Sequence, residues 1–224
     1  MKTKTDRELQ KDVMAELEWK FPLKPAEIGV SVNDGIVTLS GFTDSYYKKR
    51  EAERAAEKIE GVKAIVEKVE VKLPHSNART DEDVAKAASN ALRWDVNVPE
   101  DKVKLIVNQA WVTLEGEVDW YYQKIAAEDA VENLIGVKGV TNSIIVKPKI
   151  KPSEVSEHIK NAFRRHAQLD AERITIEIEG SKAILKGKVR SLAEKKDAER
   201  AAWLTPGVSK VENQLEISFD TVLL

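Results

Sequence analysis

The sequence predicts an α+β fold made of three tandem αββαβ units, each with a three-stranded mixed sheet and two helices on one face. A glycine closes a similar strand-like run three times, at Gly41, Gly116 and Gly187. Twenty residues after each of them stands the pair Gly-Val, and thirty-two residues before each stands Leu9, Val84 or Val155. Three fixed spacings in register indicate an internal repeat. The predicted units cover 1–74, 75–147 and 148–224.

Each unit begins with a predicted helix. In the first repeat, Thr5 and Glu8 form a capping-box pattern, which satisfies amide donors that have no partner at a helix start. Thr80 and Ser153 are the corresponding caps in the other two repeats. Apolar residues then recur at helical spacing, as in Leu9, Val13 and Leu17.

Two strands follow the helix. Apolar and polar residues alternate strictly through Ile28, Val30 and Val32, which is the period of a half-buried strand. The pair Asp34-Gly35 leads into a second alternating run. Because Asp-Gly between alternating runs is a strong hairpin signal, we expect these two strands to be antiparallel neighbours.

A second helix and a third strand complete the unit. The helix is rich in alanine, at Ala52, Ala55 and Ala56 in the first repeat, and small residues allow close approach to the sheet. We expect it to end at the second glycine, in a left-handed C-cap. The third strand then runs through Ile65, Val69 and Val71. Only one face of the sheet shows consistent burial, so both helices are predicted on that face.

Composition and charge exclude several classes of protein. The net charge is −2, and the three repeats carry 0, −4 and +2, so a nucleic-acid binder that neutralises phosphates is not expected. The sequence has no cysteine, and therefore neither disulfides nor thiolate metal ligands. It has no apolar run long enough to span a bilayer and no apolar core of a secretory signal near its start. We expect a cytoplasmic protein.

The sequence offers no catalytic, cofactor or metal site. Of the three histidines, His75 lies in a predicted linker, while His158 and His166 are eight residues apart on one predicted helix, too far to chelate a metal together. No serine has the Gly-x-Ser-x-Gly context of a nucleophile. Acidic residues interleave with lysines, as on a solvated helix face. We therefore expect a protein that is not an enzyme.

The repeat resembles the BON domain of bacteria. The resemblance rests on the glycine that ends the second strand, the alanine-rich helix, and the motif Gly-Val-x-x-Val-x-Asn before the last strand. The second and third repeats carry this motif through Asn142 and Asn213, whereas the first has Glu67 at that place. The resemblance implies a stress-associated protein. Some envelope members associate with anionic phospholipid near the second helix, and a cytoplasmic relative is thought to bind potassium.

Two groups of residues exceed what the fold requires. The first is aromatic and basic and lies at the start of the second helix, where such side chains suit a lipid headgroup region or a partner surface. Tyr46 and Tyr121 have a structural alternative, which is to cover the core. The lipid or partner candidates are Tyr46, Tyr47, Lys48, Lys49, Trp120, Tyr121, Tyr122 and Lys124.

The second group is apolar and lies on the open sheet face of the middle repeat. It consists of Ile106, Trp111 and Ile145, where the third repeat has charged residues. On this comparison only the middle repeat has an apolar open face, and such a patch indicates a contact. The contact is with a neighbouring repeat, with a second copy of the chain, or with a lipid or small molecule.

These patterns together predict a non-catalytic binding or scaffold protein. Three linked modules raise the effective concentration at a surface even when each alone binds weakly. Homo-oligomeric assembly suits the apolar middle face, and phospholipid binding suits the aromatic helix starts. The alternative function is that of a sensor for a small ligand or cation such as potassium.

Overall fold

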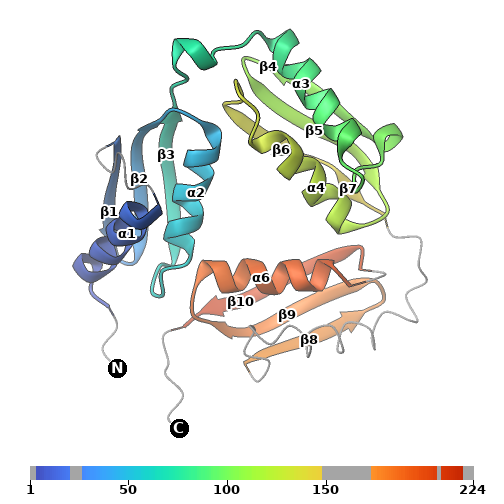
Figure 1. Ribbon diagram of the computed structural model, residues 1–224. Coiled ribbons are helices and arrows are strands. Elements are labelled where there is room, and N and C mark those ends of the chain that lie inside the picture. Colours follow the sequence, from blue (N-terminus) through green and yellow to red (C-terminus); the bar gives the residue numbers. More distant parts are fainter. Residues whose placement is uncertain (1–3, 21–26, 148–172, 206–207, 219–224) are drawn as a thin grey trace. The chain divides into compact units, whose positions relative to one another are not determined.

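The computed structural model describes residues 4–20, 27–147, 173–205 and 208–218, and every structural statement below concerns these ranges. Figure 1 shows them as three small units in chain order, each with its own sheet. The predicted α+β class and the threefold repetition are confirmed. The first predicted helix of the third repeat, with Ser153, His158 and His166, lies outside the described residues.

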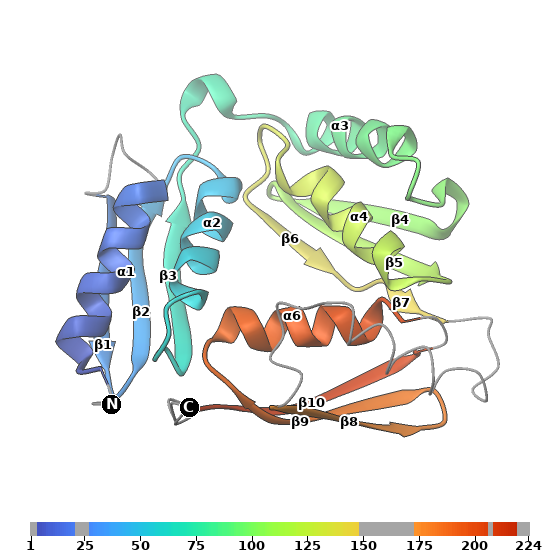
Figure 2. The same ribbon diagram turned by 60° about the horizontal axis from the view of Figure 1, so that its bottom comes forward.

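In the first repeat the sheet has the order β1-β2-β3. Helix α1 precedes the hairpin β1–β2 in the chain, and α2 connects the hairpin to β3. Both helices pack on one side of the sheet, as Figure 2 shows. The elements are α1 (Asp6–Lys20), β1 (Ile28–Asn33), β2 (Ile36–Thr43), α2 (Tyr46–Glu57) and β3 (Ala64–Val71).

The middle repeat has the same order, with its third strand divided in two. Strand β5 pairs antiparallel with β4 and parallel with β6 and β7, which makes the sheet mixed, as predicted. Between β6 and β7 the amide of Ser143 still donates to the carbonyl of Leu114, at 2.8 Å. The elements are η2 (His75–Asn77), α3 (Asp81–Trp94), η3 (Glu100–Lys102), β4 (Val103–Asn108), β5 (Trp111–Val118), α4 (Tyr121–Glu132), β6 (Gly139–Asn142) and β7 (Ile145–Val146).

The third repeat follows the same plan in its described part. Strand β9 pairs antiparallel with β8 and parallel with β10, and α6 lies between β9 and β10 in the chain. The elements are β8 (Ile174–Glu179), β9 (Lys182–Val189), α6 (Leu192–Trp203) and β10 (Lys210–Ile217).

In the first two repeats the core lies between the sheet and its two helices, and in the described part of the third it lies between the sheet and α6. In the first repeat Leu9, Val13 and Leu17 of α1 are buried, as the helical spacing predicts, and they pack with the alanines of α2. Full burial of each large side chain contributes about 1.5–3 kcal/mol. Alanines at the contact, such as Ala55, keep α2 close to the buried Val37 and Leu39 of β2.

The anchor glycine of the repeat is explained by a close approach of two backbones. Gly41, Gly116 and Gly187 have φ values of +119°, +135° and +127°, a region that disfavours L side chains. A Cβ on Gly116 would lie 1.9 Å from the carbonyl oxygen of Lys102, and a Cβ at either of the other two meets an equivalent carbonyl at 2.0 Å. Any side chain here would separate the hairpin strands, so the position requires glycine.

An aspartate at the start of the first helix holds the hairpin turn. In the middle repeat the Asp81 carboxylate accepts hydrogen bonds from the amides of Gln109 and Ala110, both at 2.8 Å. In the first repeat Asp6 binds the amides of Asp34 and Gly35 in the same way, at 2.8 and 2.9 Å. The helix start and the turn are therefore fastened to each other.

The predicted starts of the first helix are confirmed in the first two repeats, but the predicted ends of the second helix are wrong. Thr5 and Glu8 form the expected capping box, and Thr80 forms one with Asp83. Helices α2 and α4 end at Glu57 and Glu132, before the glycines that were expected to cap them. These glycines, Gly61 and Gly136, do have positive φ, but they lie in the turn that leads into the next strand.

Candidate functional site

The indole of Trp111 lies flat on the open sheet face of the middle repeat. Its Nε1 donates to Oγ1 of Thr141 on the neighbouring strand, at 2.8 Å. Its ring covers Gly139, where a Cβ would stand only 2.4 Å from two ring atoms. The side chain is held in one orientation while 46% of its surface stays exposed. It is a rigid apolar platform rather than a loose surface residue.

The other two apolar candidates on this face are separate from each other. Ile106 is 55% exposed and lies opposite Thr113 on β5, near the Trp111 end of the sheet. Ile145 is 54% exposed and lies opposite Glu117, toward the far end of β5. An ion pair between Glu117 and Lys147 at 2.5 Å borders Ile145. The structure therefore brings Ile106 close to Trp111 and places Ile145 apart.

The prediction that only the middle repeat has an apolar open face was wrong. On the first repeat Ile36, Phe42 and Val66 are 40%, 41% and 40% exposed on the strands of its sheet. The sequence comparison used only three aligned positions, and Val66 and Phe42 were not among them. Alternation along β3 would have predicted this exposure, because Val66 follows the inward-facing Ile65 and therefore lies on the open face.

The open face of the third repeat is charged, as predicted. Lys182 pairs with Glu212 and Lys186 with Glu177, both at 2.5 Å. Between them Ile184 is only 6% exposed. The hydrogen bond from Lys182 is the main cause that lowers the pKa of Glu212. This face presents paired charges where the first two repeats present apolar side chains.

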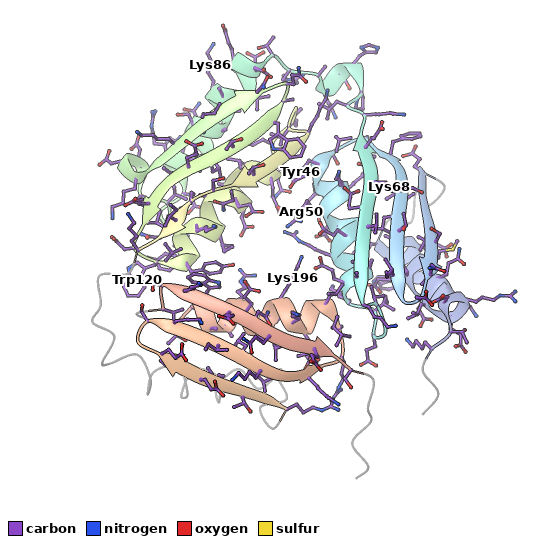
Figure 3. All side chains as sticks on the ribbon, turned by 180° about the vertical axis from the view of Figure 1, so that it is seen from behind. Tyr46, Arg50, Lys68, Lys86, Trp120 and Lys196 are labelled. Atoms are coloured by element: carbon purple, nitrogen blue, oxygen red, sulfur yellow. The ribbon has the colours of Figure 1, made fainter. Side chains whose placement is uncertain are left out.

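The aromatic candidates at the helix starts divide into exposed and covered side chains. Tyr47 and Tyr122, which occupy the same position in two repeats, are 46% and 45% exposed. Tyr46 is only 7% exposed, and Tyr121 is half-buried. Trp120, labelled in Figure 3 before α4, is also half-buried, and its amide donates to Gln123.

Two of the lysines in this group have partners within their own repeat. Lys48 forms an ion pair with Asp44 at 2.6 Å. Lys124 donates through Nζ to the carbonyl oxygen of Ile144, at 2.8 Å. Burial lowers the pKa of Lys124, and the nearby Glu128 carboxylate opposes that shift. Lys49, the equivalent of Lys124 in the first repeat, is half-buried.

The asparagine of the repeat motif connects the second helix to the third strand. Asn142 donates through Nδ2 to the carbonyl of Lys124 at 2.8 Å and to Glu128 at 3.1 Å, while its Oδ1 accepts from the amide of Ile144. In the third repeat Asn213 makes the same three contacts, with Lys195, Glu199 and Leu215. We call this arrangement the asparagine lock.

The first repeat makes only part of the asparagine lock. Glu67 accepts from the amide of Val69 at 2.6 Å, which reproduces the contact made by the asparagine oxygen. A carboxylate has no N–H donor, so it cannot reproduce the bond to the helix carbonyl. The motif therefore has a structural role, which the sequence alone did not reveal.

A shallow groove runs between α3 and the edge strand β4. It has a volume of about 420 Å³ and is lined by Ala85, Lys86, Ser89, Asn90 and Leu105. Sequence reasoning missed it because its lining residues on α3 are small or polar and give no motif. The small side chains of Ala85 and Ser89 are what leave the space open.

The described residues give two further findings about chemistry. They contain no group of three or more His, Cys, Asp or Glu side chains placed to hold a metal ion. None of the helices in these ranges is both long enough and apolar enough to cross a membrane.

The chain is similar to several known proteins. The osmotically-inducible protein Y of Escherichia coli (strain K12) is 31% identical over 134 residues, which is 56% of this chain and 64% of that protein. Two structures of CdsD, a structural protein of the type III secretion system of Chlamydia trachomatis, align at 14% identity with TM-scores of 0.26 and 0.25. The first covers 92% of both chains, and the second, a structure of the CdsD C-terminal domain, covers 93% of this chain and 98% of that chain.

The family model provides the identification. The model of the BON domain matches residues 5–72, 80–148 and 153–218, which is most of the sequence. These matches coincide with the αββαβ repeats, the anchor glycines and the asparagine motif described above. The chain belongs to the BON domain family, with three tandem domains.

Proposed function

We propose that this chain is a non-catalytic scaffold protein of the osmotic-stress response that acts by multivalent contacts, with self-association as the main contact. One observation carries the proposal. The open sheet faces of the first and middle repeats leave large apolar side chains exposed, with Ile106 at 55% and Ile36 at 40%. Exposed apolar patches on folded domains commonly mark contacts with other proteins.

The polar groups support a structural rather than a catalytic role. Lys124 and Asn142, the polar side chains packed between α4 and the third strand, bind backbone groups of their own repeat. Asp81 is engaged by the hairpin turn. The link to osmotic stress rests on similarity to a relative whose name describes osmotic induction.

Multivalency is what three weak modules would provide. Each repeat alone offers a small contact surface, but joining the repeats makes later contacts intramolecular and raises the overall affinity by about 10²–10⁴ where the geometry permits. A scaffold of this kind needs no large cationic patch. The balanced net charge of −2 is consistent with that.

Light scattering of the pure chain tests the proposal. A monomer has a mass of 25.1 kDa. We expect a weight-average mass above this value that rises with protein concentration. A monomer mass throughout the accessible range would refute self-association.

Phospholipid binding is a second candidate, and one observation favours it. Tyr47 and Tyr122 are exposed at the same position of two repeats, at the start of α2 and α4. Amphipathic aromatic side chains are suited to a lipid headgroup region. Co-sedimentation with anionic vesicles, compared between the wild type and Tyr47→Ala/Tyr122→Ala, would test it. Binding that is absent, or equal in both proteins, would exclude these tyrosines as the contact.

A further inference from the structure

Strand β4 of the middle repeat lies at the edge of its sheet, and among the described strands it pairs with β5 alone. Its backbone pattern follows from the two-residue turn at Gln109 and Ala110, because Asn108 and Trp111 flank that turn as a hydrogen-bonded pair. The bonded pairs alternate from there. Val103, Leu105 and Val107 therefore direct their amides and carbonyls away from β5, toward the open edge.

The first repeat covers its equivalent edge with a side chain. Gln10 of α1 donates through Nε2 to the carbonyl oxygen of Val30 on β1, at 2.7 Å. In the middle repeat the corresponding positions are Ala85 and Leu105, and alanine cannot make this bond. Within the described residues, no side chain donates to the Leu105 carbonyl. In place of the glutamine lies the groove between α3 and β4.

Charge also distinguishes this edge from that of the third repeat. Strand β8 carries Glu177 and Glu179, and charges on an edge strand discourage pairing with another strand. Strand β4 carries a single charge, Lys104, and no proline. Exposed, nearly uncharged and regular, β4 is better suited than β1 or β8 to accept another strand.

We propose that β4 pairs antiparallel with β4 of a second copy of the chain, with Leu105 of each copy on the twofold axis. The proposal rests on the self-association put forward above and names its surface. Leu105 lies opposite its own counterpart, and Val103 lies opposite Val107 of the second copy. Outward backbone groups then meet outward backbone groups, and the two sheets join into one. An interface of this kind is its own complement, as a twofold axis requires.

The register explains the surrounding side chains. On the open face Lys104 lies opposite Ile106 of the second copy, so that no like charges face each other. Shifting the strands so that Lys104 met its own counterpart would oppose two ammonium groups. On the helix side, Leu105 of the second copy lies at the groove lined by Ala85 and Ser89. The groove gives that side chain a place to pack.

Substitutions taken from the structure test the pairing by sedimentation velocity on the full chain. Ala85→Gln copies the cover of the first repeat onto the edge, and we expect association to weaken roughly tenfold, as loss of about 1.4 kcal/mol would produce. Ile106→Lys places one ammonium group opposite Lys104 of the second copy, on each side of the twofold axis, and should also weaken association. Ile106→Glu places opposite charges there and should preserve it. The control, Ser31→Lys, adds the same charge at the same position of the first repeat and should change nothing.

A cross-link test uses the absence of cysteine from the chain. A mixture of Lys104→Cys and Ile106→Cys chains should form a disulfide-linked dimer under mild oxidation, and more readily than either variant alone. If the wild type associates but Ala85→Gln and Ile106→Lys associate like it, the edge pairing is wrong and the proposed function stands. Equal weakening by Ile106→Lys and Ile106→Glu would also overturn the edge pairing. If the wild type is a monomer throughout, the proposed function itself fails.

Discussion

The side-chain amide of Asn142 donates to the carbonyl oxygen of Lys124, and the ammonium group of Lys124 donates to the carbonyl oxygen of Ile144, each at 2.8 Å. These two bonds fasten α4 to the interruption between β6 and β7. The bond from Lys124 satisfies the Ile144 carbonyl at this interruption, where a buried group without a partner would cost free energy.

Replacing Asn142 with alanine should loosen the middle repeat alone. Loss of the asparagine lock leaves the Lys124 carbonyl and the Ile144 amide without these partners, at a cost of about 1–3 kcal/mol. Hydrogen exchange of the segment around β6 measures the local opening free energy. Asn213→Ala should have the same effect in the third repeat only. Equal exchange rates in wild type and variant would show that the lock contributes nothing.

The converse change should stabilise the first repeat. Glu67→Asn supplies the N–H donor that this repeat lacks and allows the complete asparagine lock. We expect slower exchange around β3, by an amount that corresponds to about 1 kcal/mol for one added hydrogen bond. Glu67→Gln, which has an amide on a longer side chain, is the matched control. Faster exchange in Glu67→Asn than in the wild type would contradict the explanation of the motif.

The middle hairpin turn should gain stability from the residue that the first repeat has there. Ala110 has φ of +65°, and its equivalent Gly35 has φ of +78°. The left-handed conformation costs an L residue about 1–2 kcal/mol, so Ala110→Gly should stabilise the turn. Loss of one small buried methyl group reduces this gain. Asp81→Ala should destabilise it, since the turn amides lose their carboxylate. Thermal unfolding of both variants tests the pair, and opposite shifts are expected.

The repeat and its element order were predictable because they depend on local patterns. Capping residues, alternation and conserved spacing around Gly116 are all read along the chain. The asparagine lock was not predictable, since Asn142 and Lys124 meet only when helix and strand pack. The groove beside Ala85 was missed for the same reason: an absent side chain gives no motif. To predict that Val66 and Phe42 are exposed, one must know which face of the sheet each side chain occupies.

The open face of the middle repeat should contribute to assembly beyond any pairing of β4. Trp111→Lys removes an indole that is 46% exposed, so melting should change little while the weight-average mass at high concentration falls. Trp94→Lys is the control, because Trp94 is 83% exposed on α3 and away from the sheet. If Trp111→Lys leaves both melting and mass unaltered, the platform takes no part in assembly.

Acid should weaken the first repeat through Glu51. Burial raises the pKa of this carboxyl, but hydrogen bonds from Lys20 and Arg54 outweigh burial, and the pKa is lowered. The folded state therefore binds fewer protons than the unfolded state, so this contribution is complete above pH 4.5, the ordinary pKa, and is lost as pH falls through the folded pKa. An NMR titration of the Glu51 carboxyl carbon should give a midpoint below 4.5, and Lys20→Met should raise it. A midpoint at or above the ordinary value would contradict this assignment.

Sedimentation equilibrium of the full chain at several concentrations, beside Ile106→Lys, tests the central claim most directly. A scaffold that associates through β4 predicts a wild-type mass that rises with concentration from 25.1 kDa, and a lower mass for the variant at each concentration. A wild-type mass of 25.1 kDa at every concentration would contradict the account.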